Sequence, residues 1–69
     1  MNSKWQKVYT THMMYRAEIV KAVLEDHHLN PVLVDKQDTS YHFGTIELYV
    51  APDEVINAMK IIEDDISFK

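Results

Sequence analysis

A helix-length stretch lies between two short β-type runs in the first half of this chain, and that order limits the folds available to it. Residues 5–10, WQKVYT, have the aromatic and β-branched content of a strand. Residues 32–35, VLVD, predict a second strand after Asn30-Pro31, which stops a helix. Apolar residues recur at helical spacing between the two runs: Ala17, Val20, Val23 and Leu24, with Ile19 beside them. A strand–helix–strand unit of this kind crosses over with a right-handed sense.

The second half predicts another strand and another helix. Residues 45–50, TIELYV, alternate between apolar and polar side chains, which is typical of a strand with one buried face. Residues 51–54, APDE, predict a helix start, with proline at the first position and two acids in the first turn. The second helix is expected to bury Val55, Met59 and Ile62, with Ala58 beside them. Thr11 is the expected N-cap of the first helix.

These elements assemble into an α+β fold that forms a single domain over residues 1–69. We predict a ferredoxin-like βαββα unit, with a three-stranded antiparallel sheet of order 1-3-2 and two helices on one face. The expected sheet core is Val8, Val32, Val34, Ile46, Leu48 and Val50.

Size and charge narrow the functions that such a domain can have. With 69 residues, its stability as a monomer is expected to be only about 3–5 kcal/mol. There is no cysteine, so oligomerisation is the remaining common way to gain stability. The net charge is −4 and the basic residues are scattered, which argues against nucleic-acid binding. No apolar run is long enough to span a membrane and no signal peptide is visible, so a soluble cytoplasmic protein is expected.

Two helices on one side leave the other face of the sheet uncovered. The alternation is expected to place Trp5, Tyr9, Leu33 and Tyr49 on that face, beside Lys7 and Glu47. These rings and the Lys7–Glu47 pair could simply shield the sheet. Alternatively the face is a contact surface, since monomers seldom expose such a patch and interfaces are rich in tyrosine and tryptophan. We favour a homodimer formed through this face, and a partner protein could use it in the same way.

The polar segment 36–44 is a second candidate site. The topology is expected to bring it to one end of the sheet with the start of the first helix and the acidic end of the second, Glu63 and Asp64. The possible ligand or partner residues there are His12, Lys36, Asp38, Tyr41 and His42. They could hold a metal or a small anion, but no spacing matches a metal motif, so no metal ligand or cofactor is assigned. The alternative is a solvated turn in which Gly44 supplies a bulge or a positive φ.

Catalytic motifs are missing from the chain. It has no Gly-rich phosphate loop, no serine elbow, no cysteine nucleophile and no paired-acid motif, so no catalytic residue is assigned and no enzyme is expected.

Several sequence blocks together resemble a small bacterial family. These blocks are VYTT, YRAEIVKAVLED, NPVLVDK and IELYVAPDEVINAMKIIEDD, and they cover nearly the whole chain. The family is that of the putative prokaryotic signal transducing proteins, a domain of unknown function. The resemblance implies a βαββα fold related to the PII-like signalling proteins, which bind nucleotide between subunits and contact targets through a long loop. Here the loop is shorter, and the basic phosphate-binding residues and fourth strand of PII proteins are missing, so no functional residue is carried over.

The sequence therefore predicts a non-enzymatic regulatory or interaction module that dimerises through the open sheet face. The alternative is a small-ligand or metal-binding protein that uses His12, His42 and nearby acids.

Overall fold

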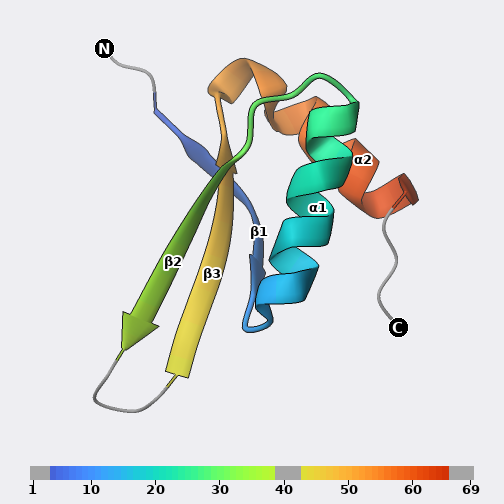
Figure 1. Cartoon of the computed structure of the whole chain (residues 1–69). Helices are drawn as coiled ribbons and strands as arrows, with labels where there is room; N and C mark the ends of the chain where they lie inside the picture. Colours follow the sequence, from blue (N-terminus) through green and yellow to red (C-terminus); the bar gives the residue numbers. More distant parts are fainter. Residues whose placement is uncertain (1–3, 39–42, 66–69) are drawn as a thin grey trace.

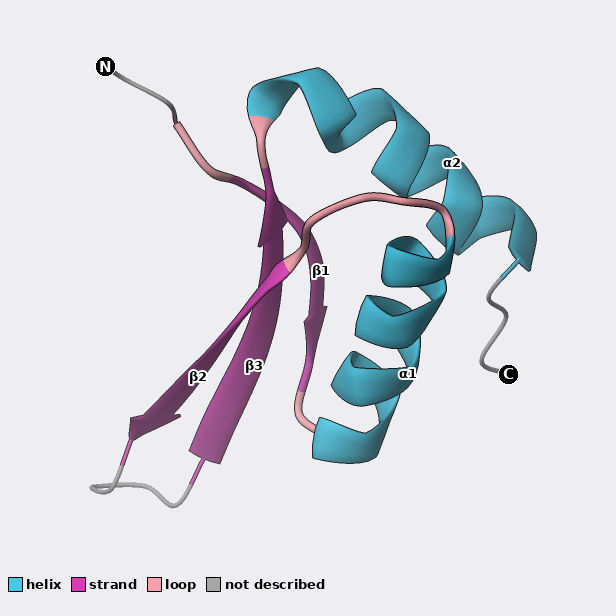
Figure 2. Ribbon diagram, turned by 45° about the horizontal axis from the view of Figure 1, so that its top comes forward, coloured by secondary structure: helices cyan, strands magenta, loops and turns pink. Residues whose placement is uncertain are grey.

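The computed structural model describes residues 4–38 and 43–65. Its elements are β1 (Gln6–Thr11), α1 (Met14–Asp26), β2 (Val32–Asp38), β3 (Phe43–Val50), the 3-10 turn η1 (Pro52–Glu54) and α2 (Val55–Asp65). The strands form an antiparallel sheet of order β1-β3-β2, and both helices lie on one side of it (Figures 1 and 2). The predicted α+β, ferredoxin-like βαββα fold is therefore confirmed. Within the described residues, neither helix is long and apolar enough to cross a membrane.

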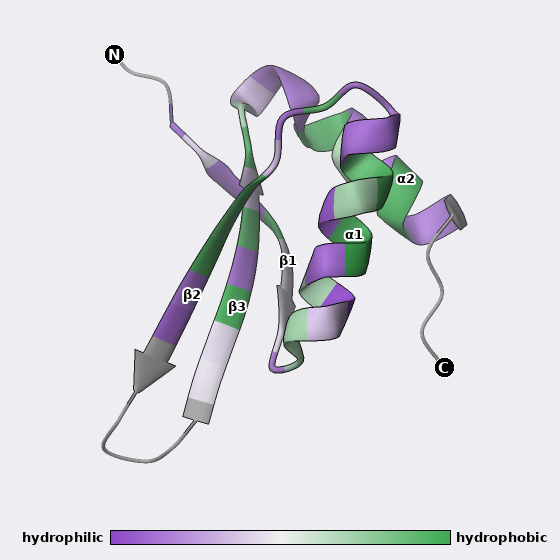
Figure 3. Cartoon of the chain, viewed as in Figure 1, coloured by the Kyte–Doolittle hydropathy of each residue, from purple (hydrophilic) through white to green (hydrophobic). Residues whose placement is uncertain are grey.

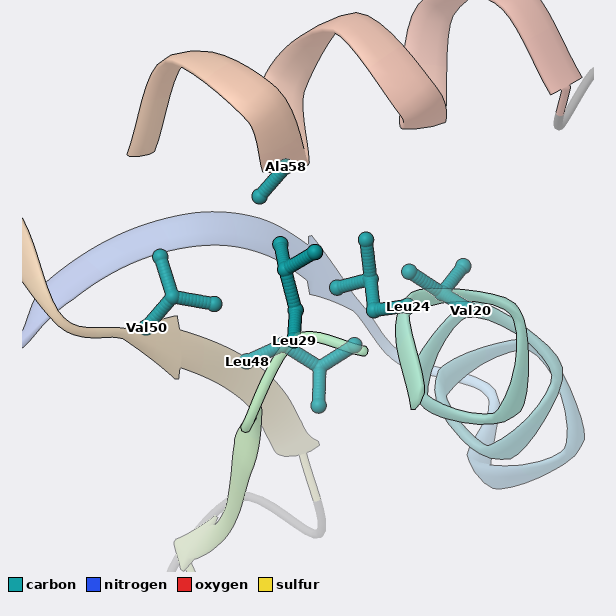
Figure 4. Close-up of a cluster of buried hydrophobic side chains, with 6 residues drawn as sticks. All are labelled: Val20, Leu24, Leu29, Leu48, Val50 and Ala58. Atoms are coloured by element: carbon teal, nitrogen blue, oxygen red, sulfur yellow. The ribbon is translucent and has the colours of Figure 1, made fainter. Parts of the chain in front are cut away.

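The hydrophobic core lies between α1, α2 and the central strand β3. Its buried members are Ala17, Val20, Leu24, Leu29, Ile46, Leu48, Val50 and Ala58. Figure 4 shows Ala58 of α2 directed toward Leu29 and Val50, where a small side chain lets the helix lie close to the sheet. The prediction that α2 buries Met59 is wrong, because Met59 is 54% exposed. Val55 and Ile62 pack against the core as predicted, and Ile61 packs there in place of Met59.

The start of α1 differs from the prediction. Met13 is the N-cap residue and makes no side-chain capping bond. Thr11 is the last residue of β1, where it pairs with Ile46, so its backbone is extended and it is not the N-cap. Its hydroxyl still accepts a hydrogen bond from the Met13 N–H at 3.1 Å. Thr11 therefore shapes the turn that leads into the helix.

The end of α1 is closed by the backbone rather than by a glycine. The Leu29 N–H donates to the Leu24 carbonyl at 3.0 Å, and the His28 N–H donates to the Glu25 carbonyl at 2.9 Å. This pair of bonds is the Schellman arrangement, which needs a left-handed residue after the cap. His28 fills that place with a φ of 68°. The chain then turns directly toward β2.

The connection from α1 to β2 is tied to the start of α2. Asn30 donates from its backbone N–H and its side-chain amide to the two carboxylate oxygens of Glu54, each at 3.3 Å. Pro31 follows and is buried. The Asn30–Glu54 contact therefore links two segments that lie 24 residues apart.

The hairpin of β2 and β3 is longer than predicted. Its ladder continues through Lys36↔Thr45, Gln37↔Gly44 and Asp38↔Phe43, so most of the segment 36–44 is strand and not loop. Gly44 pairs in this ladder, and no glycine in the described ranges has a positive φ. The bulge lies in β1 instead, between Lys7 and Tyr9. Figure 3 shows β2 changing from hydrophobic to hydrophilic residues along its length toward the hairpin end.

Candidate contact surface

The side of the sheet that faces away from the helices is the first candidate site. Directly paired residues in an antiparallel sheet point to the same side. The pairing Lys7↔Tyr49↔Val32 therefore forms one row on this side, and Thr10↔Glu47↔Val34 forms the next. We call this surface the open face; among the residues whose side chains the structure describes, its members are Lys7, Thr10, Val32, Val34, Lys36, Thr45, Glu47 and Tyr49, together with Trp5. Trp5 is included by alternation, since it lies two residues before Lys7.

Two residues predicted for this surface lie on its other side. Tyr9 pairs with Leu48 and Leu33 also pairs with Leu48, and both pack against the hydrophobic core. The bulge at Val8 reverses the alternation of β1 and carries Tyr9 to the helix side. The predictions that placed Tyr9 and Leu33 on the open face are therefore wrong.

Two valines take their place. Val32 and Val34 were predicted in the core, but they oppose Tyr49 and Glu47 on the open face. Val32 is 41% exposed. Tyr49 keeps its predicted side, where it pairs with Lys7 and Val32. Trp5 precedes β1 and is 50% exposed, and its place on the open face stays a prediction. Whether any of them forms an interface stays a prediction.

Glu47 lies at the centre of the open face and binds three neighbours. The Tyr49 hydroxyl donates to its Oε1 at 2.6 Å. Lys36 Nζ lies 3.2 Å from the same oxygen, and Lys7 Nζ lies 3.6 Å from Oε2. Only 8% of the residue is exposed. The Lys7–Glu47 pair, which belongs to the alternative in which side chains simply shield the sheet, is present, and Lys36 and Tyr49 complete a cluster around the same carboxylate.

The cluster changes the proton affinities of its members. The hydrogen bond from the Tyr49 hydroxyl lowers the pKa of Glu47 below its ordinary value; burial opposes this, and Lys36 and Lys7 lower the pKa further. The same hydrogen bond raises the pKa of Tyr49, with burial acting in the same direction. Lys36 has a raised pKa because of its hydrogen bond to Glu47 and the negative charge there. The shifts therefore favour a charged Glu47, a charged Lys36 and a neutral Tyr49.

The pKa shifts predict how Glu47 contributes to stability. Because the folded pKa of Glu47 is lowered, its contribution is present above the ordinary value of 4.5 and is lost as the pH falls through the folded pKa. Lys36 and Tyr49 have raised pKa values, so their contributions are lost only as the pH rises beyond 10.5 and 10.0. Glu47→Gln should therefore be less stable than the parent between about pH 5 and 9, and the difference should shrink below pH 4.

Urea unfolding at a series of pH values measures this difference. Glu25→Gln is the control, since it removes an exposed helix pair to Lys21 at 3.3 Å and should cost less than about 0.5 kcal/mol. A difference between Glu47→Gln and the parent that stays constant down to pH 3 would contradict the expected linkage.

The second candidate site is the end of the sheet where the connection from β2 to β3 and the start of α1 lie. The structure describes part of this site. His12 Nδ1 donates to the Gly44 carbonyl at 2.7 Å, so the start of α1 and the hairpin do meet as predicted. A carbonyl can only accept, so Nδ1 carries a proton in this contact. Tyr41 and His42 lie outside the described residues, and so does the side chain of Asp38.

Two other residues predicted for this end, Lys36 and Asp64, have contacts away from His12. Lys36 belongs to the open face through its bond to Glu47. Asp64 lines a pocket with His27 and Leu29 at the opposite end of α1, so the prediction that it joins His12 is wrong. Across residues 4–38 and 43–65, no group of three histidine or acidic side chains is placed to hold a metal ion. The alternative function, binding of a small ligand or a metal, stays a prediction. It depends on His42, which lies outside the described residues.

Sequence reasoning missed the full cluster around Glu47 for a definable reason. The second strand was expected to end at Asp35, so Lys36 was assigned to a loop. The i, i+2 spacing of Glu47 and Tyr49 was a usable signal, because such residues share a face of a strand.

The fold and the open face define a small α+β domain of ferredoxin-like type with one uncovered sheet surface. The chain belongs to the family described as putative prokaryotic signal transducing protein, whose profile matches residues 5–65. This confirms the resemblance noted in the sequence and gives a regulatory role in general terms; the description names no reaction. No curated protein and no solved structure matches the chain.

Proposed function

We propose that this protein is a non-enzymatic regulatory module that acts by protein contact through the open face. One observation carries the proposal: the central strand presents a nearly buried carboxylate with two lysines and a tyrosine bound to it, inside a surface that also carries Trp5, Val32 and Val34. Glu47 is nearly buried, whereas the side chains of Lys7 and Lys36 are 51% and 60% exposed. A protein partner on this surface would cover the exposed lysines and exclude water from the cluster, which strengthens its hydrogen bonds.

Self-association is the simplest form of such contact, and it stays a prediction. A second copy would cover Trp5 and Tyr49, and a small domain without disulfides would gain stability from it. Trp5→Glu or Tyr49→Glu would then abolish association and leave the helices intact.

Site-specific photocrosslinking in cells of the source organism tests the proposal. A benzoylphenylalanine is placed at Val32 on the open face or, as the control, at Ile56 on α2, which is 82% exposed. The proposal expects a discrete crosslinked product from position 32 and none from position 56. The mass of the product tells a second copy from another protein, and light scattering on the purified chain checks a dimer independently. No product from position 32, or equal products from both positions, would overturn the proposal.

A further inference from the structure

A cavity of about 340 Å³ lies where the end of α1 meets α2, on the helix side of the sheet and away from the open face. Figure 2 shows these two helix segments beside each other. The cavity is lined by His27, Leu29, Asn57, Lys60, Ile61 and Asp64. Small-molecule sites in proteins have volumes of about 300–1,000 Å³, so this cavity has room for a small metabolite.

The cavity has an apolar floor and a polar rim. Leu29 belongs to the buried core, and Ile61 packs against that core. Asn57, Lys60 and Asp64 are exposed and lie at positions i, i+3 and i+7 of α2, so they follow one another along the helix surface. An apolar lining with a few polar groups that orient the ligand is the usual arrangement of a small-molecule site.

The rim carries one positive and one negative charge that are not joined to each other. Lys60 and Asp64 lie four residues apart, yet neither forms an ion pair in the part of the chain that the structure describes. Lys21 and Glu25 have the same spacing on α1 and are paired at 3.3 Å. Aspartate is one methylene shorter than glutamate, so its carboxylate reaches less far along the helix. Both charges of the rim therefore remain available to a ligand.

A ligand that matches this rim carries both charges close together. Side chains at i and i+4 of a helix have Cβ atoms about 5–6 Å apart. A carboxylate beside Lys60 and an ammonium beside Asp64 can therefore belong to one small molecule. The side-chain amide of Asn57 offers a further donor and acceptor beside them. A ligand with a single charge would leave the other charge of the rim unmatched.

We infer that this cavity binds a small zwitterion with an apolar side chain, that is, a free aliphatic amino acid. Its carboxylate accepts hydrogen bonds from Lys60 and Asn57, and its ammonium donates to Asp64. Its side chain covers the floor formed by Leu29 and Ile61. Such binding is independent of the contact role proposed for the open face, because the cavity lies on the other side of the sheet.

Amide chemical shifts of the full chain, followed during titration with leucine, test this assignment. Two probes of similar shape provide the comparison: isocaproate lacks the ammonium group, and isoamylamine lacks the carboxylate. Leucine should give saturable shifts of the amides of residues 57–64 and of Leu29, with a Kd of about 1 mM or lower. Each of the other two probes should bind at least about tenfold more weakly, because one charge of the rim then has no partner.

Neutral variants separate the two charges of the rim. Lys60→Met and Asp64→Asn should each weaken leucine binding by about tenfold or more. Lys21→Met and Glu63→Gln make the same changes of net charge at residues that do not line the cavity, and each should change the affinity by less than about twofold. Circular dichroism checks that all four variants are folded. No saturable shift with leucine, equal binding of leucine and isocaproate, or equal effects of Asp64→Asn and Glu63→Gln would overturn the assignment.

Discussion

Leu24→Ala is expected to leave most of the protein unfolded at 25 °C. Leu24 has no exposed surface and lies in the cluster of α1, α2 and β3 side chains. Truncation of a buried leucine to alanine costs about 2–5 kcal/mol, because apolar surface is lost and a cavity remains. A domain of this size has only about 3–5 kcal/mol of stability in total. The loss is therefore comparable to the whole free energy of unfolding.

Urea titration followed by circular dichroism measures this effect. The control is Ile19→Ala, a truncation in the same helix at a position that is 45% exposed, which should cost less than about 1 kcal/mol. If Leu24→Ala and Ile19→Ala lost the same stability, α1 would not pack against the sheet as described.

Ala58→Leu is expected to give the second largest loss, about 1–3 kcal/mol. Ala58 is fully buried and its side chain is directed toward Leu29 and Val50 (Figure 4). A leucine there has no space to occupy unless α2 moves away from the core. Overpacking of this kind forces side chains out of their preferred rotamers and shifts the backbone.

The same leucine placed one residue earlier is the matched control. Asn57 is exposed on α2, so Asn57→Leu should change the free energy of unfolding by less than about 0.5 kcal/mol. Thermal and urea unfolding of both variants measures the difference. An Ala58→Leu variant as stable as the parent would mean that α2 does not approach the sheet closely at this position.

The open face explains two features that otherwise have no common cause. Glu47 is nearly buried although it lies on the uncovered side of the sheet, and Lys7 and Lys36 reach toward it from opposite edges. The Glu47 carboxylate attracts both ammonium groups, and each lysine loses side-chain entropy that it would keep in water. A contact surface gains from fixed positions, and this is why the proposed function rests on this cluster.

The order of elements was predictable because each one carries a strong local signal. Ala17, Val20 and Leu24 recur at helical spacing, and Ile46, Leu48 and Val50 alternate without interruption. The sheet order followed from the crossover rule and from the short hairpin connection. The fold implied by the family resemblance has the same order of elements. The family match over residues 5–65 confirms that resemblance.

The sequence did not predict which residues of β1 and β2 face the helices. Val32, Leu33 and Val34 are consecutive apolar residues, so either parity could have faced the helices. Pairing of Leu33 with Leu48 decides the question, because it places the larger side chain in the core. In β1 the bulge at Val8 reverses the alternation, and a bulge leaves no signal when no glycine marks it.

The sequence by itself determined the class of fold, the order and type of the elements and the inward face of β3, since these depend on periodicity within single segments. Only the tertiary structure decided the register of β1 and β2, the left-handed conformation of His28 and the gathering of Lys7, Lys36 and Tyr49 around Glu47. The physical reason is that a register shift of one residue moves every side chain of a strand to the other face. That choice depends on the energy of packing between segments, and no single segment contains it.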